Sequence, residues 1–129
     1  MRAALFALLL ATPCLAETPM TAEEFDAFAT GKTLEFSNES GVFGVEDYLP
    51  GRKVRWAATG DICKLGEWFP AGDAICFTYD NLPEQHCWTV WQEGDHLAAR
   101  SLLDGPDRQP RQITLADAPV ACTGPDVGV

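Results

Sequence analysis

Short, largely apolar segments rich in aromatic and β-branched residues follow one another after residue 32, separated by polar turns rich in Gly, Pro, Asn and Asp. Aromatic and β-branched residues are typical of β-strands, whose side chains point to opposite faces in turn. The pattern predicts strands at residues 33–37, 42–48, 53–59, 64–69, 74–80, 86–92, 96–103 and 111–115. Their even spacing favours an antiparallel meander.

A short helix is predicted before the first strand. Thr21 and Glu24 have the spacing of a capping box, and Phe25 and Phe28 fall on one helical face. Gly31 suits the left-handed conformation in which many helices end.

The predicted fold class is mainly β. A meander of seven or eight strands in so short a chain has exposed edges unless the sheet curls and closes. We therefore expect a small barrel or a strongly bent sheet, with the N-terminal helix plugging one end and two disulfides.

The first residues have the pattern of a secretory signal peptide. Arg2 precedes an apolar run that ends near Ala11 and is too short to span a bilayer, and small residues lead up to Ala16. We expect cleavage after Ala16 and export to the periplasm or the extracellular space. Lipidation at Cys14 is a weaker alternative, because Pro13 fits a lipidation box poorly. The expected domains are a signal peptide at 1–16, a β-rich domain at 17–115 and an extended tail at 116–129.

Four cysteines remain after this cut, and an even number in a small exported domain indicates two disulfides. Cys76 and Cys87 flank the Asn81-Leu82-Pro83 turn nearly symmetrically, so they can face each other across a hairpin. That leaves Cys63 for Cys122, a pairing that would pin the tail.

Charge and composition restrict the partners. The formal net charge of the 129-residue chain is −10, which disfavours binding to nucleic acid and to anionic lipid headgroups. No other apolar run is long enough for a membrane span. We expect a monomer.

The stretch from Gly66 to Trp91 is the densest in aromatic, cysteine and histidine residues. Pleat parity places its larger apolar residues on one face. Four residues of this stretch and the preceding Trp56 are candidates either for the core or for the lining of a ligand pocket inside the barrel: Trp56, Trp68, Phe77, Tyr79 and Trp88.

Strand pairing gives sharper expectations. With Cys76 opposite Cys87, Ile75 pairs with Trp88 and Phe77 with His86. Across the turn at residues 70–73, Trp68 should lie beside Ile75, and Gly66 beside Phe77. The simplest register through Gly60 and Asp61 puts Val54 and Trp56 on the wrong face, so we hypothesise a β-bulge at Gly66.

No catalytic residue, metal site or cofactor is predicted. His86 and Cys87 are neighbours on a strand and point to opposite faces, and the chain lacks the usual zinc spacings. There is no Gly-x-Ser-x-Gly elbow. The acidic pair Glu46 and Asp47 is interpreted as a surface pair that flanks a turn.

The chain resembles a family of small exported bacterial proteins of unknown function. The resemblance rests on a helix ending at Gly31-Lys32-Thr33, a Gly66-Glu67-Trp68 hairpin, an Ile75-Cys76-Phe77 strand and Cys87-Trp88. It implies export and a compact β domain without implying an activity.

The leading hypothesis is an exported, non-enzymatic binding domain that engages a small apolar ligand in the barrel or a protein partner on its surface. The alternative is a protease-inhibitor-like or envelope-stress interaction protein, and an enzyme of unknown type comes third. A ligand carrier should show an enclosed pocket lined by Trp and Phe. A partner-binding module should show an exposed apolar patch near its turns. An enzyme should bring a perturbed carboxylate or histidine into a cleft.

Overall fold

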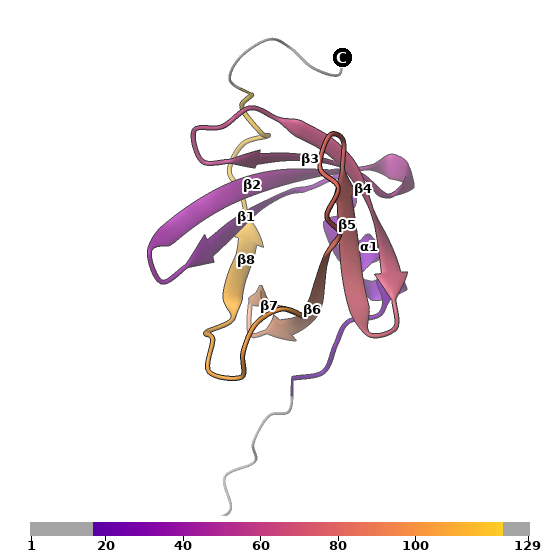
Figure 1. The fold of residues 1–129 in the computed structure, drawn as a ribbon, viewed down its shortest axis with the longest axis vertical. Helices are drawn as coiled ribbons and strands as arrows, with labels where there is room; N and C mark the ends of the chain where they lie inside the picture. The colour runs from indigo at the N-terminus through magenta and orange to yellow at the C-terminus, as the bar shows by residue number, and fades with distance from the viewer. Residues whose placement is uncertain (1–16, 123–129) are drawn as a thin grey trace, which may run out of the picture.

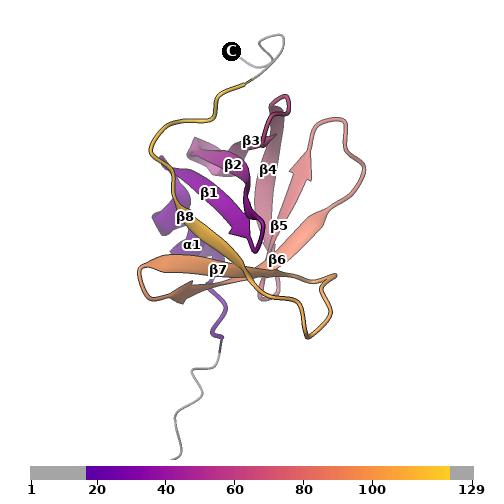
Figure 2. The ribbon, with the colours of Figure 1, turned by 90° about the vertical axis from the view of Figure 1, so that its left-hand side faces the viewer.

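The computed structural model of the chain describes residues 17–122. These residues form a closed antiparallel barrel in which each strand pairs with the next and the last pairs with the first (Figure 1). The strands are β1 (Thr33–Asn38), β2 (Gly41–Leu49), β3 (Lys53–Ala58), β4 (Lys64–Ala71), β5 (Ala74–Tyr79), β6 (His86–Glu93), β7 (His96–Ser101) and β8 (Arg111–Leu115). The predicted fold class is therefore confirmed. Figure 2 shows β8 between β1 and β7, where it closes the barrel.

The helix α1 (Ala22–Ala29) begins at the predicted capping box. The Glu24 amide donates to Thr21 Oγ1 over 3.2 Å, and the Thr21 amide donates to the Glu24 carboxylate over 2.9 Å. Gly31, just beyond the helix, has a φ of 84°, which only glycine adopts readily. The two ends of α1 are thus determined by residues next to them in the sequence.

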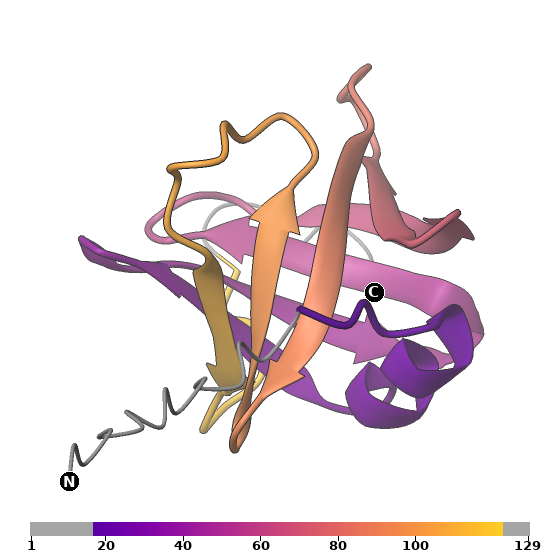
Figure 3. The same ribbon diagram turned by 90° about the horizontal axis from the view of Figure 1, so that it is seen from below.

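One end of the barrel is closed by α1, which lies beside the short 3₁₀ turn η1 (Pro50–Arg52) that connects β2 to β3 (Figure 3). Phe25 packs edge-on against Tyr48 and Trp68, with ring centroids 5.5 and 5.1 Å apart. One core cluster fills this helix end and extends into the interior of the barrel as far as the cavity described below: Ala22, Phe25, Ala29, Leu34, Tyr48, Val54, Trp68, Ile75, Phe77, Val90, Leu97, Ala99 and Ile113.

Strands β5 and β6 pair at only three positions, Ile75 with Trp88, Cys76 with Cys87, and Phe77 with His86. This is the predicted register. Farther along β6, where β5 has ended, the Met20 amide donates a 2.7 Å hydrogen bond to the Val90 carbonyl. The segment before α1 thus covers part of the edge that β5 leaves free.

Both predicted disulfides are present. Cys76 and Cys87 join β5 to β6 with a Cα separation of 4.0 Å, and Cys63 joins Cys122 with a Cα separation of 5.2 Å. The second bridge fixes residues 116–122 on the outside of the barrel, where Val120 packs with Ala57 and Cys63. The predicted signal peptide at 1–16 and the last residues of the tail lie outside the described residues.

Two register expectations were wrong. Trp68 lies opposite Phe77 and Gly66 opposite Tyr79, because β4 continues through Pro70 to Ala71 and the turn is tighter than predicted. β3 pairs with β4 only as far as Glu67, so the missing amide hydrogen of Pro70 interrupts no bond on that side.

No bulge occurs at Gly66. Val54 pairs with Gly66 and Trp56 with Lys64 without a register shift, so Trp56 and Trp68 point to the same face. The loop between β3 and β4 is centred on Gly60 rather than on the Gly60–Asp61 bond, and this removes the conflict. The register shift that the barrel does contain lies between β1 and β2, at Phe36 and Ser37.

Candidate functional site

The end of the barrel away from α1 contains a cavity of about 200 Å³. Its walls come from the strand ends next to the β1–β2, β3–β4, β5–β6 and β7–β8 connections, so it opens between these loops. The lining residues are mainly aromatic or aliphatic: Phe36, Phe43, Glu46, Trp56, Lys64, Phe77, Tyr79, Leu82, His86, Trp88, Val90, Ala99, Arg111 and Ile113.

Three rings form the wall on the β1 to β3 side. Trp56 packs edge-on against Phe36 with centroids 5.4 Å apart, and Phe43 lies 6.2 to 6.3 Å from both. The Trp56 indole crosses directly over Gly44, since a Cβ built there would lie 2.1 Å from the ring. The absence of a side chain at Gly44 therefore sets the position of this wall.

A single carboxylate is buried inside the barrel. Glu46 points inward from β2 and is 1 % exposed. Tyr79 reaches it from β5 and donates a 2.6 Å hydrogen bond to Oε2. Tyr48 interacts with the same carboxyl, although its buried hydroxyl does not reach hydrogen-bonding geometry with any group of residues 17–122.

Burial raises the pKa of Glu46 to about 7. The hydrogen bond from Tyr79 and the nearby Tyr48 hydroxyl oppose this rise, and the negative charge of Asp47 adds to it. Burial and the neighbouring Glu46 carboxyl also raise the pKa of Tyr79, so its hydroxyl stays protonated. Glu46 is therefore a group that can gain or lose a proton near neutral pH inside an apolar cavity.

The cations that line the cavity already have anionic partners. Lys64 Nζ lies 3.3 Å from Asp61 Oδ2. Arg111 pairs through two nitrogens with Asp104, at 2.5 and 3.1 Å, and its guanidinium lies 5.1 Å from the centre of the Trp88 ring. Both side chains are therefore neutralised by a carboxylate at the edge of the cavity.

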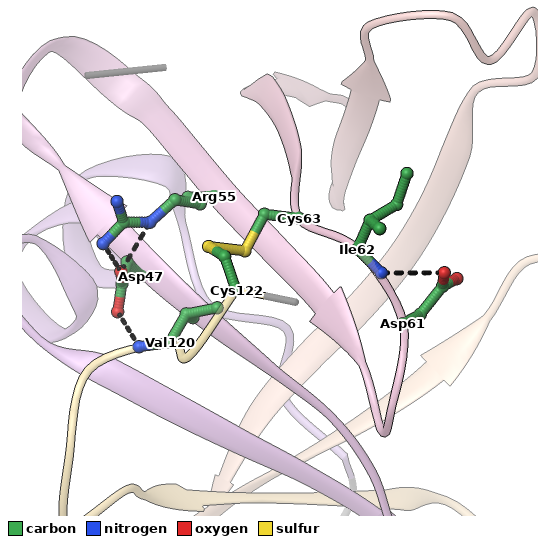
Figure 4. The surroundings of a disulfide bond; sticks show 7 residues. All are labelled: Asp47, Arg55, Asp61, Ile62, Cys63, Val120 and Cys122. Carbon is green, nitrogen blue, oxygen red and sulfur yellow. Dashed lines mark hydrogen bonds and ion pairs between the residues drawn. A yellow bond between two sulfur atoms is a disulfide. The ribbon is translucent and has the colours of Figure 1, made fainter. Parts of the chain in front are cut away.

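Asp47 points the opposite way from Glu46 and lies on the outside of the barrel, beneath the tail (Figure 4). It accepts hydrogen bonds from Arg55 at 2.6 and 3.0 Å, from Thr33 Oγ1 at 2.6 Å and from the Val120 amide at 3.1 Å. Burial alone would raise the pKa of Asp47, but these donors and the Arg55 charge outweigh it and lower the pKa.

The prediction that Glu46 and Asp47 form a surface pair was therefore wrong. Their exposed fractions are 1 % and 5 %. Consecutive strand residues face opposite sides, so one of the two had to point into the barrel. The other is covered by the tail, which a distant disulfide holds in place.

The five candidate pocket or core residues divide between the two ends of the barrel. Phe77, Tyr79, Trp56 and Trp88 line the cavity, whereas Trp68 belongs to the core against α1. Sequence reasoning missed Glu46 and the rings of Phe36 and Phe43. Pleat parity could have found Glu46, because it pairs with Trp56 across β2 and β3.

Residues 17–122 contain no group of three His, Cys, Asp or Glu residues that could hold a metal ion. His86 is exposed at the β6 end of the cavity, 6.5 Å from the Tyr79 ring. No helix in the described part of the chain is long and apolar enough to cross a membrane.

Fold and site together define a closed antiparallel barrel with a half-filled interior and one buried carboxylate. Comparison of the chain with protein-family models, curated proteins and solved structures found no match. Its function is therefore argued from its own geometry, and the resemblance to a family of exported proteins stays a prediction.

Proposed function

We propose that this protein is an exported binding protein whose barrel holds a small, largely apolar molecule. The observation that carries the proposal is the contrast between the two ends of the barrel. The helix end is filled by a continuous core, whereas the other end keeps a cavity of about 200 Å³ with aromatic walls. Protein interiors are normally packed as densely as organic crystals, and an open hollow of this size with aromatic walls is typical of a binding site for a small molecule.

The composition of the walls supports the same function. Binding pockets for small molecules are mostly apolar and contain a few polar groups that fix the orientation of the ligand. Here Phe36, Phe43, Trp56 and Trp88 supply apolar surface, and Glu46 with Tyr79 supplies one polar position.

Export is supported by the two disulfides, which are typical of oxidising compartments, and by the signal-peptide pattern in the sequence. The periplasm or the extracellular space is the proposed place of action. The protein is proposed to act as a monomer without a cofactor.

Native mass spectrometry of the protein purified from its own cell envelope tests both parts. We expect a mass that lacks residues 1–16 and an additional non-covalent mass of a small organic molecule. A chain still beginning at Met1 would contradict export.

Binding can be tested separately with a naphthylamine dye whose fluorescence rises in apolar surroundings. We expect the wild-type protein to bind the dye and Ala99→Leu to bind it less, because Ala99 lines the cavity and a larger side chain fills it. Leu103→Ala is the matched control, since Leu103 is 91 % exposed outside the cavity. Equal binding by all three proteins, or no binding by the wild type, would contradict a ligand site in the barrel.

A second candidate function is binding of a protein partner at the loops around the cavity. The observation that favours it is that large apolar side chains are exposed near these connections: Val42, Ile62, Leu82, Leu102 and Leu103. Exposed apolar groups gathered in this way are common at interaction sites. If this candidate is correct, an Ile62→Ser, Leu102→Ser, Leu103→Ser variant, which changes no residue of the cavity lining, loses a co-purifying protein and still binds the dye.

A further inference from the structure

We infer that the ligand of the barrel is an organic cation, an amine with a small apolar body, whose ammonium group is bound by Glu46. The inference rests on the proposed function and names the chemical class of its ligand. It is carried by the charges inside the cavity, by its aromatic walls and by its size.

The first argument is the charge balance of the cavity. Of the acidic and basic groups that line it, Lys64 and Arg111 are already paired with Asp61 and Asp104. Glu46 is buried, interacts with the hydroxyl groups of Tyr79 and Tyr48, and forms no ion pair within residues 17–122. The other charge that acts on it is Asp47, which has the same sign. A buried carboxylate without a cation carries a large desolvation cost, and a bound ammonium group would offset it.

The second argument is the chemistry of the walls around this carboxylate. Trp56 lies opposite Glu46 across β2 and β3, and Phe36 and Phe43 pack against Trp56. Ring faces attract cations through their quadrupoles, and indole does so best. A buried carboxylate next to aromatic rings therefore favours a positively charged ligand over a neutral or an anionic one.

The charge of the whole molecule acts in the same direction. The chain has 19 acidic and nine basic residues and a formal net charge of −10. A negative potential raises the local concentration of cations and repels anions.

Cavity size limits the body of the ligand. An apolar cavity of about 150 Å³ holds benzene, so the cavity of about 200 Å³ fits a ring with a short side chain. Suitable probes are 2-phenylethylamine, 2-phenylethanol and phenylacetate, which have similar shapes and differ in charge.

Isothermal titration calorimetry at pH 7.5 with these three probes tests the inference. We expect the wild type to bind the amine roughly 30-fold more tightly than the alcohol and the carboxylate, because a buried charge pair discriminates by at least this factor. Glu46→Gln should lose this preference and still bind the alcohol. Glu84→Gln is the matched control, since it removes an exposed acidic residue from the β5–β6 loop and should leave the preference unchanged.

Proton release gives a readout that a merely structural role of Glu46 would not produce. At pH 6.5 part of the protein carries a protonated Glu46, and binding of an ammonium group should expel this proton. The groups near it are Tyr48, Tyr79 and Asp47, and His86 lines the same cavity. Titrations in buffers of different ionisation enthalpy should show release by the wild type and by His86→Gln, and none by Glu46→Gln.

The outcomes separate the inference from the proposed function. Tighter binding of the alcohol or of phenylacetate, or an amine preference that survives in Glu46→Gln, would overturn the amine ligand and leave the binding function standing. The amine ligand is also wrong, and the binding function still stands, if the naphthylamine dye binds and none of the three probes does. If neither the dye nor any probe binds, both proposals are wrong.

Discussion

The Tyr79 hydroxyl donates a 2.6 Å hydrogen bond to Glu46 across 33 residues of sequence. The two residues come from β5 and β2, strands that are not neighbours in the barrel. The bond therefore crosses the interior of the barrel and fixes the carboxylate on the floor of the cavity. It also makes Glu46 an acceptor that a ligand donor can share.

The stability of the protein should fall as the pH rises from about 4.5 to 7. Glu46 has an ordinary pKa of 4.5 and a pKa of about 7 in the folded protein, so the folded state binds more protons in this window. At about 1.4 kcal/mol per pH unit, the loss amounts to about 3 kcal/mol by pH 8.

Urea unfolding of the wild type and of Glu46→Gln between pH 5 and 8 measures this effect. The variant keeps an acceptor for Tyr79 and should lack this loss of stability. Parallel curves for the two proteins over this range would contradict a raised pKa of Glu46.

Asp47 should have the opposite pH dependence. Its pKa is lowered from 3.8 by its donors, so its contribution is present above that value and is lost as the pH falls through the folded pKa. Asp47→Asn leaves Arg55, whose side chain is 30 % exposed, without its partner, and we expect a loss of about 2 kcal/mol at pH 7.

The loss in Asp47→Asn should shrink toward pH 2. Glu67→Gln serves as the control, because its pair with Lys53 is more than half exposed on both sides and should contribute at most about 1 kcal/mol. Equal losses of stability in the two variants at pH 7 would contradict the expectation that burial strengthens the pair of Asp47 with Arg55.

Gly44→Ala should deform the cavity. A Cβ at this position would lie 2.1 Å from the Trp56 ring, so the indole must move. We expect a shift of the tryptophan fluorescence, weaker binding of the dye and a loss of about 1 to 3 kcal/mol. Gly105→Ala, with no atom within 4 Å of the added Cβ, should behave like the wild type. A Gly44→Ala protein with unchanged fluorescence would show that Trp56 does not rest on Gly44.

Loss of the Cys63–Cys122 bridge should release the tail and leave the barrel closed, because residues 116–122 add no strand to it. In a Cys63→Ser, Cys122→Ser variant, we expect faster hydrogen exchange of the Val120 amide, which is bonded to Asp47. The bridge spans 59 residues, so the chain-entropy model predicts a loss of up to about 4 kcal/mol. Unchanged exchange at Val120 would mean that packing alone holds the tail.

The strands, the helix and the Cys76–Cys87 disulfide followed from local patterns, and the pairing of Cys63 with Cys122 followed by elimination. Alternation, turn residues and a capping box act within a few residues, and Cys76 and Cys87 are close in sequence. The turn after β4 was predicted too long because Pro70 was interpreted as a turn residue. Pro70 can lie in β4 because the pairing of β4 with β3 stops at Glu67. The sequence of β4 does not show where this pairing stops.

The candidate site was harder to predict because its chemistry depends on distant segments. Glu46 lines a cavity to which all eight strands contribute residues, and its hydrogen-bond donor comes from the opposite side of the barrel. Asp47 is covered by the tail, which a disulfide between Cys122 and Cys63 holds in place. These two cysteines are 59 residues apart in the sequence. In the sequence alone, the adjacent Glu46 and Asp47 resemble a solvent-exposed pair. In the closed barrel, Glu46 faces the interior and Asp47 faces the outside.

Because α1 closes one end of the described barrel, the cavity can be reached from the opposite end. A ligand bound as proposed, and the water that it displaces, would pass the same rim, formed by the loops at residues 39–40, 59–63, 80–85 and 102–110. If motion of these loops limits entry, stiffening the rim should slow loading and unloading by the same factor without changing the affinity.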